Sequence, residues 1–514
     1  MKTLKLDLVS FLTLSALSAA AATHYVVPPG TPGVNPSGEF TSWATAATNI
    51  QAAVSIATNN SLVLVASGHY RLTNQIVIAS AITLRSDKNG ALDPAGTILD
   101  AQYPSYLNRC IYINNAAAVV EGFTLTNGYA AATDLTGLGG GAYLNLKGSV
   151  RNCVIAGNRA WKGGGGAYLH QGGVLSGCTV VGNVAMTNDI GYCGGAYVTV
   201  PHTIAGLITN CLFQGNSARR GGGVNLGNDN ETLGGSTLVD CDILQNTAVI
   251  CASGDGGAGV STYRRFWMTD CRVISNSIVK INGTPYGGGI NASPGGTIRD
   301  CRVAFNSGAT YGGGIANISR ATVSNCVIES NSATWGGGIY CGTGGLVMDS
   351  FVTGNSSAAY MQGGTFRNCL FTGNGRIWAH TSAAVAFDNC TVTGHSEGFV
   401  LEQPATVENC IVYGNTSNWT QTGLGTNSVW RNSCTKPKPA GPSDVDNTDS
   451  DPRFVNAANG DFNLRGSSPC VNQGVVRTWM TGARDLQGRY RVIGTSVDMG
   501  AFEYLPMGTL MQVR

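Results

Sequence analysis

One seven-residue phrase, restated along most of the chain, constrains the fold more than any other feature. Its clearest copy is Asn210-Cys211-Leu212-Phe213-Gln214-Gly215-Asn216, in which the cysteine and the final asparagine stand five residues apart. Nine further copies carry Cys153, Cys178, Cys241, Cys271, Cys301, Cys326, Cys369, Cys390 and Cys410. The spacing within a copy is fixed, whereas the gaps between copies vary from about 20 to 33 residues. A fixed phrase with elastic gaps is typical of a solenoid, in which each coil keeps its strand and varies its loops.

Inside the phrase, apolar and variable positions alternate. The position two residues after the cysteine holds Val, Ile or Phe, as in Ile155, Phe213 and Val273, while the residue between them is free. This period of two predicts a strand whose cysteine and branched residue face the core. Burying one such Val or Ile contributes about 1.5–3 kcal/mol. The final asparagines are expected to stack and hydrogen-bond as a ladder along a turn, at about 1 kcal/mol for each bond.

Two copies of the phrase bend the rule. Ser350 replaces the cysteine, and His395 stands where the final asparagine is expected. A second phrase precedes the first in many coils, with a glycine run followed by Ala-Tyr-Leu or Ile-Tyr-Cys, as in 139–144 and 336–341. These glycines are expected to let the backbone turn and pack closely. A nucleotide-binding glycine loop is not indicated, because no helical pattern follows them.

These two phrases resemble known repeats. The chain is similar to right-handed parallel β-helix proteins of the pectate-lyase-like class, and its phrasing resembles the repeats of chlamydial polymorphic outer-membrane proteins, over roughly residues 24–435. The resemblance implies an all-β, right-handed parallel β-helix solenoid of about fourteen coils. It implies little about function, since this scaffold carries many activities.

The N-terminal end predicts export and a cap. Residues 1–22 have the basic start, apolar centre and Ala20-Ala21-Ala22 site of a signal peptide. Residues 23–435 form the predicted β-helix, which opens with a short amphipathic helix over Trp43–Ala57 that covers the first coil. Strands are expected to follow, among them Leu62–Ala66 and Ile76–Leu84.

The C-terminal end changes character after Cys434. Residues 436–450, which begin Lys-Pro-Lys-Pro, predict a stiff polar linker. Residues 451–514 contain Asp451-Pro452-Arg453-Phe454, Gly460-Asp461-Phe462 and Val497-Asp498-Met499-Gly500-Ala501-Phe502. This series resembles the choice-of-anchor Q module of secreted bacterial β-helix proteins, and it implies a small C-terminal β module. The expected location is therefore secreted or at the cell surface.

Charge and length exclude other classes of partner. Only 12% of the residues are charged and the formal net charge is +2, so neither nucleic acid nor an anionic membrane surface is indicated as a partner. No later run approaches the roughly 18 apolar residues of a membrane span. We expect a monomer.

The 16 cysteines of this chain predict a column of thiols in place of a disulfide framework. Stacked coils hold the phrase cysteines about 4.8 Å apart, slightly beyond the distance between β-carbons that a disulfide prefers. The predicted column therefore consists of buried, unpaired thiols. Cys193, Cys251, Cys341, Cys434 and Cys470 lie off this column, and a bridge between Cys434 and Cys470 is left open. No spacing of cysteines or histidines indicates zinc.

Aromatic residues recur at fixed places and are the first candidate site. One row is formed by Tyr143, Tyr168 and Tyr197, with His170 two residues beyond Tyr168, and a second by Tyr286, Tyr311 and Trp335. Rings stacked about 5 Å apart offer flat apolar faces to sugar rings. The alternative is that they only stabilise neighbouring strands.

Acidic residues form the second candidate site. Asp240, Asp270 and Asp300 precede cysteines at intervals of 30 residues, and Arg272 and Arg302 follow two residues on. Such a column could hold calcium and a uronate for β-elimination, or it could be a set of surface ion pairs worth about 0–1 kcal/mol each. No cofactor is expected, apart from the calcium ion that this column could hold.

The leading functional hypothesis is an exported, adhesin-like protein that binds polysaccharide along its aromatic rows. The alternatives are a lyase or glycoside hydrolase acting on an acidic polysaccharide, and a purely structural surface protein. The sequence signatures of polygalacturonases and pectate lyases are absent, so whether the chain is an enzyme is left open.

Overall fold

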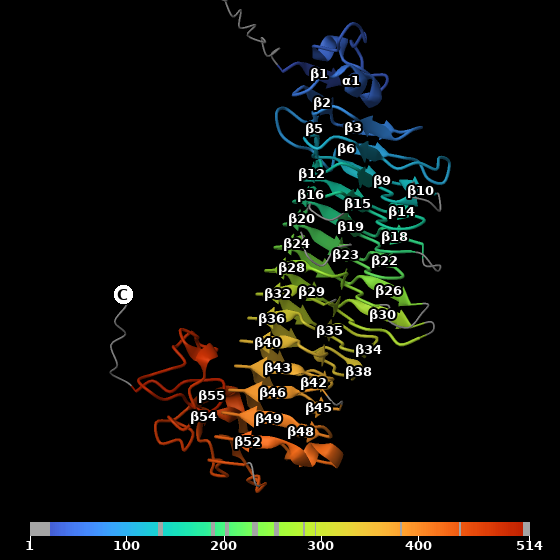
Figure 1. The fold of residues 1–514 in the computed structure, drawn as a ribbon. Coiled ribbons are helices and arrows are strands. Elements are labelled where there is room, and N and C mark those ends of the chain that lie inside the picture. Colours follow the sequence, from blue (N-terminus) through green and yellow to red (C-terminus); the bar gives the residue numbers. More distant parts are fainter. Residues whose placement is uncertain are drawn as a thin grey trace, which may run out of the picture.

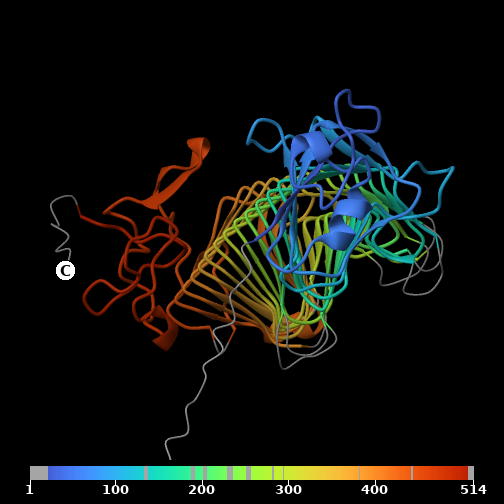
Figure 2. The same cartoon turned by 90° about the horizontal axis from the view of Figure 1, so that it is seen from above.

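The chain winds into a tall stack of coils built from parallel strands (Figure 1). The computed structural model describes residues 21–506, except 132–136, 187–190, 201–204, 229–234, 251–255, 281–282, 293, 381–382 and 442–443. Seen from above, successive coils overlie one another, and the C-terminal module lies beside the stack (Figure 2). The predicted all-β parallel β-helix is confirmed. The predicted signal peptide lies almost entirely outside the described residues.

Three long parallel sheets form the sides of the stack. The 16-stranded sheet runs from β1 (Thr23–Val26) and β2 (Leu62–Ala66) to β52 (Val429–Arg431). The 15-stranded sheet runs from β3 (Gly68–Arg71) to β53 (Cys434–Thr435). The 14-stranded sheet runs from β4 (Ile76–Ile78) to β51 (Ser417–Gln421). Each strand pairs with its counterpart in the next coil, so that like side chains form columns.

Smaller sheets lie beside these three. Six two- to four-residue strands from β10 (Tyr129–Ala130) to β30 (Ser277–Lys280) form a further parallel sheet, and β34 (Ala309–Tyr311) pairs with β38 (Ala333–Trp335). In the C-terminal module, β54 (Phe454–Asn456) and β55 (Asp461–Leu464) form an antiparallel hairpin.

The N-terminal cap is shorter than the predicted helix over Trp43–Ala57. A 3-10 turn, η1, covers Trp43–Thr45, and the α-helix α1 covers only Ile50–Ile56. Asn49 starts α1, because its side chain accepts a 3.1 Å hydrogen bond from the Ala52 amide. None of the helices that the structure describes has the length and apolar character that a membrane crossing requires.

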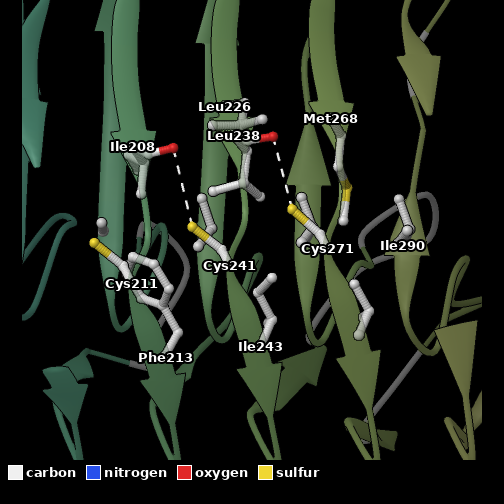
Figure 3. Close-up of a cluster of buried hydrophobic side chains, with 14 of the residues drawn as sticks. Ile208, Cys211, Phe213, Leu226, Leu238, Cys241, Ile243, Met268, Cys271 and Ile290 are labelled. Carbon is white, nitrogen blue, oxygen red and sulfur yellow. Dashed lines mark hydrogen bonds between the residues drawn. The ribbon is translucent and has the colours of Figure 1, made fainter. Parts of the chain in front are cut away.

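The predicted thiol column is confirmed in the core (Figure 3). Cys211, Cys241 and Cys271 are buried, and each directly precedes a strand of the 15-stranded sheet in three consecutive coils. Cys241 Sγ lies 3.9 Å from the Ile208 carbonyl oxygen of the preceding coil. All fifteen described cysteines are buried and unpaired, including Cys434 and Cys470. Cys251 lies outside the described residues.

The predicted asparagine ladder is also present. The Asn276 side-chain oxygen Oδ1 accepts from the Asn246 backbone amide at 2.9 Å and from the Asn246 side-chain amide at 3.0 Å. The same bonds recur from Asn158 through Asn374, all of them buried. At the next step His395 replaces asparagine, and its backbone amide donates to Asn415 at 2.9 Å. Because each rung satisfies a buried amide of the previous coil, the ladder fixes the turn between two sheets.

The residue before each cysteine of the repeated phrase has a left-handed backbone. Asp240, Asp270 and Asp300 have φ of 52°, 53° and 53°, and Asn210, Asn325 and Asn409 have φ of 50°, 51° and 53°. Asn and Asp tolerate this conformation better than other residues with a side chain. The turn therefore explains why only these residue types, or glycine, stand here.

In the last coils this left-handed column also holds the C-terminal module. The Asn389 side chain donates to the Asp498 carbonyl at 3.0 Å, and the Asn409 side chain both donates to Val475 O and accepts from Val475 N. Deeper in the module, the fully buried Arg491 pairs with Glu503 at 3.0 Å. Residues 444–448 lie against the last coil, where Val445 pairs in parallel with Arg431, although they fall in the predicted linker.

Candidate functional site

The first predicted row of tyrosines packs as a column on the outer side of the 14-stranded sheet. Tyr112, Tyr143, Tyr168 and Tyr197 stand in register on β7 (Ile111–Ile113), β11 (Ala142–Leu144), β15 (Ala167–His170) and β19 (Ala196–Val200). Their ring centroids are 5.0–5.4 Å apart. Tyr143 is only 7% exposed and Tyr168 only 3%. Burial raises the pKa of Tyr143, which keeps its phenol protonated.

The surroundings of this column explain its burial. Leu138 packs against Tyr143 and Tyr168, and the Arg109 guanidinium lies 5.2 Å from the Tyr143 ring centroid. His170 Nδ1 lies 3.2 Å from the Thr199 hydroxyl. Outward strand positions are thus covered by neighbouring segments, and this column presents little ring surface to a ligand. Glycan contact by Tyr143, Tyr168, His170 and Tyr197 stays a prediction.

The column does not continue through the middle of the molecule. In the following coils the same register position is occupied by Asn225, Ser261, Asn291 and Ala316. Aromatic residues return near the C-terminal end as Tyr340, Tyr360 and Trp378, on β39 (Ile339–Cys341), β42 (Ala359–Met361) and β45 (Ile377–Ala379). The aromatic side chains therefore form two separate clusters.

The second cluster gathers the predicted row of Tyr286, Tyr311 and Trp335 around these three strands. Tyr286 and Tyr311 stack with centroids 5.2 Å apart, and Trp335 lies 4.9 Å from Trp378. Tyr340 and Tyr360 are 7% and 6% exposed, whereas Trp335 and Trp378 are half-buried. Burial raises the pKa of Tyr340 and of Tyr360, so both phenols stay protonated.

Trp335, Tyr360 and Trp378 line a groove of about 280 Å³. The Arg376 guanidinium lies 4.7 Å from the Trp378 ring centroid and 3.4 Å from Glu397 of β48 (Glu397–Leu401). Both charged side chains are more than a third exposed. Serine residues from neighbouring coils, Ser356, Ser357 and Ser396, complete the lining. We call this site the aromatic groove. It combines the faces of two indole rings with a positive and a negative side chain and with serine hydroxyls.

A histidine–carboxylate contact also lies beside Trp378. His380 Nδ1 is 2.7 Å from Glu402, and the His380 and Trp378 ring centroids are 4.6 Å apart. Arg376, Trp378 and His380 are alternate residues of one coil and so share a face of the strand. The next coil supplies a glutamate to Arg376 and to His380. An imidazole in contact with a carboxylate is an arrangement that general acid–base catalysis uses.

The predicted acidic column does not bring its arginines to its aspartates. Arg272 pairs with Asp242 at 3.1 Å, and Arg302 contacts Glu329 at 2.6 Å. Asp300 pairs instead with Arg299 at 2.7 Å, and this hydrogen bond lowers the pKa of the Asp300 carboxyl. Among the described residues, no group of three His, Cys, Asp or Glu side chains is arranged to hold a metal ion. A catalytic or calcium-binding role for Asp240, Asp270, Asp300, Arg272 and Arg302 stays a prediction.

The sequence predictions missed most of the aromatic groove. Only Trp335 was among the predicted site residues, while Arg376, Trp378, Glu397, His380 and Glu402 were not. Alternation in Arg376-Ile377-Trp378-Ala379-His380 was a usable signal, because the polar and aromatic residues occupy every second position. Their glutamate partners, 21 and 22 residues later, become visible only when the coils are in register.

Comparison with known proteins finds matches among solved structures only. No protein-family model matches the sequence, and none of the curated proteins matches it. Among solved structures, the chain is similar to the pectate lyase Pel9A, with 14% identity over 94% of this chain and 97% of that chain and a TM-score of 0.30. It is also similar to a GH136 lacto-N-biosidase from Eubacterium ramulus, with 12% identity over 71% of this chain and 64% of that chain and a TM-score of 0.32. At these TM-scores no site or activity is transferred.

Proposed function

We propose that this protein is an exported, adhesin-like β-helix protein that binds polysaccharide in the aromatic groove. The observation that carries this proposal is the pair of half-buried indoles, Trp335 and Trp378, facing a groove that also holds the Arg376–Glu397 ion pair. Apolar ring faces suit the C–H faces of a sugar, and the charged pair and serine hydroxyls suit its hydroxyl groups. Export rests on the N-terminal sequence.

The geometry favours a repeating ligand. The groove is built from consecutive coils, so its ring faces are spaced about 5 Å apart along the stack. An extended polymer can contact several of these faces at once, which raises its affinity above that of one sugar unit. The walls are side chains on rigid strands, which limits the ordering cost of binding.

A glycan array followed by calorimetry with the best oligosaccharide tests this proposal. We expect Trp378→Ala to weaken binding at least about tenfold, since it removes one ring face. Trp267→Ala is the matched control, because Trp267 is an exposed tryptophan (42%) on the 16-stranded sheet, outside the groove. Equal affinity of the two variants, or no glycan retained by the wild type, would contradict the proposal.

A second candidate is a polysaccharide lyase or glycoside hydrolase, favoured by the His380–Glu402 pair beside Trp378. A screen for new reducing ends and for unsaturated products on acidic and neutral polymers, with calcium and with chelator, tests it. Turnover lost in His380→Ala would assign the chemistry to the aromatic groove. Turnover lost in Asp270→Ala or Arg272→Ala would assign it to the acidic column instead.

A further inference from the structure

A second hollow lies where the C-terminal module meets the β-helix. It has a volume of about 810 Å³ and separates the ends of β44 (Leu370–Thr372) and β47 (Thr391–Thr393) from the hairpin β54–β55. Thr372, Thr393 and Tyr413 line it from the β-helix, and Asp451, Arg453 and Arg465 from the module. We call it the module cleft. We propose that the module cleft is a second saccharide site and that it takes a sugar bearing an acidic group.

Two arginines against one aspartate give the cleft lining an excess of positive charge, which favours an acidic ligand. Arg453 and Arg465 are exposed. Among the described residues, the Arg453 guanidinium donates only to the Ser467 carbonyl at 3.0 Å, and that of Arg465 only to the Val455 carbonyl at 2.8 Å. Within the described part of the chain, neither forms an ion pair with a carboxylate. Both retain donors that can bind a carboxylate or sulfate group in a forked geometry.

Arg453 is also held in a conformation that its residue type does not favour. Its φ is 52°, in the left-handed region where Gly and Asn are the common residues. The Asp451 carboxylate accepts a 2.8 Å hydrogen bond from the Arg453 backbone amide and stabilises this turn. Asparagine at this position would keep the same backbone, whereas a β-branched residue would strain it.

The remaining lining indicates a sugar, where a small inorganic anion would be the alternative. Tyr413 of the β-helix and Phe454 of the module are half-buried rings that line the cleft, and Thr372 and Thr393 come from adjacent coils. An acidic pyranose would use the ring faces, the hydroxyls and the guanidiniums together. The proposal rests on the proposed function only in taking the ligand to be a glycan, because the cleft shares no lining residue with the aromatic groove.

Calorimetry with three trisaccharides on the full chain tests the proposal. The probes are a uronic acid trisaccharide, its carboxyl-reduced neutral counterpart and a sulfated trisaccharide. The variant is Arg453→Asn with Arg465→Gln, in which asparagine tolerates the left-handed backbone. Arg431→Gln, an exposed arginine outside the cleft, is the matched control. Unchanged circular dichroism and thermal midpoint establish that each variant is folded.

We expect the wild type to bind an acidic trisaccharide at least about tenfold more tightly than the neutral one, with affinity falling as salt rises. The double variant should lose this preference and the control should keep it. A higher affinity for the uronate or for the sulfated probe identifies the acidic group. Equal wild-type affinity for all three probes, no binding of either acidic probe, or wild-type affinity in the folded double variant would overturn the proposal.

The same titrations separate this inference from the proposed function. If Trp378→Ala weakens glycan binding while the double arginine variant does not, the result supports binding in the aromatic groove and contradicts binding in the module cleft. If only the double arginine variant loses binding, the result supports the module cleft and contradicts the aromatic groove.

Discussion

The middle coils and the last coils of this solenoid share the same strand pattern, but the two proposed binding sites lie in or beside the last coils. From Cys153 to Asn331 the cysteine column and the asparagine ladder are unbroken, and glycine runs precede the strands. From Ser350 to Asn415 the cysteine is once replaced, the ladder is interrupted at His395 and the glycine runs are missing. The aromatic groove, the module cleft and the seat of the C-terminal module all lie in or beside these last coils.

The difference teaches where to look in a repeat protein. A rule that successive coils obey describes packing, as the buried cysteine column and the asparagine ladder of the regular coils show. Where coils depart from the repeat, surface positions become available for binding residues. The predictions below test whether the regular coils are mainly structural and whether each departure is tolerated or costly.

The largest effect is expected at Tyr168, in the regular part. Tyr168→Ala removes a 3% exposed ring and should lower the free energy of unfolding by about 3 kcal/mol, because the neighbouring tyrosines cannot fill the cavity. Urea unfolding followed by circular dichroism measures it. The half-buried Trp378 is the counterpart in the last coils, and Trp378→Ala should cost clearly less. If both variants lost the same stability, the division into a packed cluster and an open one would be wrong.

A somewhat smaller loss is expected at Asn276 in the ladder. Asn276→Ala leaves the buried Asn246 backbone amide and the Ile243 carbonyl without their partners, which should cost about 1–3 kcal/mol. The exposed Ser332, which follows the ladder residue Asn331, provides the control, since Ser332→Ala should change stability by less than about 0.5 kcal/mol. A neutral Asn276→Ala would argue that the ladder only accompanies the turn.

The break in the ladder predicts a pH dependence. Burial lowers the pKa of His395 from 6.5 to about 4, so the unfolded chain binds the proton more readily than the folded chain. The contribution of neutral His395 to the free energy of unfolding is therefore fully present above pH 6.5, and it is lost as the pH falls from 6.5 towards 4. At about pH 5.5 the loss should be roughly 1.4 kcal/mol, and His395→Asn should abolish it. Parallel pH profiles of the two proteins would show that His395 is not the titrating group.

The smallest effect is expected at Ser350. Its hydroxyl accepts from the Cys326 amide at 3.1 Å, much as Cys211 Sγ accepts from the Cys178 amide at 3.4 Å. Ser350→Cys should therefore change the unfolding free energy by no more than about 0.5 kcal/mol, whereas Ser350→Ala should cost about 1 kcal/mol. Thermal unfolding of both variants measures this. A large loss in Ser350→Cys would mean that this coil is shaped around the smaller hydroxyl.

Sequence reasoning succeeded where one residue type repeats and failed where different residues meet. The thiol column and the ladder follow from the offset of five, since identical residues in register must stack. Ile76–Leu84 was predicted as one strand but forms β4 (Ile76–Ile78) and the start of β5 (Thr83–Asp87), because a continuous apolar run does not reveal a corner. Tyr143 does occupy an outward position, yet period-two alternation does not show which segment covers it.

The candidate sites were harder to predict for a similar reason. The aspartates before the cysteines drew attention as a charged column, whereas their φ near 52° gives them a backbone role that asparagine fills equally well. The Arg376–Glu397 and His380–Glu402 pairs depend on the exact register of two coils without glycine runs. The module cleft depends on how the C-terminal module docks, and no periodicity within the coils encodes that.

The left-handed asparagines of the last coils have a consequence for how such a chain can change in length. Asn368, Asn389 and Asn409 must keep their mutual spacing, because each reaches a particular backbone group of residues 475–498. Duplication of a whole coil farther upstream would lengthen the β-helix, and loss of a coil would shorten it. Neither would disturb the contacts of these three asparagines with the C-terminal module. The number of coils before Asn368 can therefore change during evolution, and with it the length of the β-helix. The last coils and the docked C-terminal module would keep their structure.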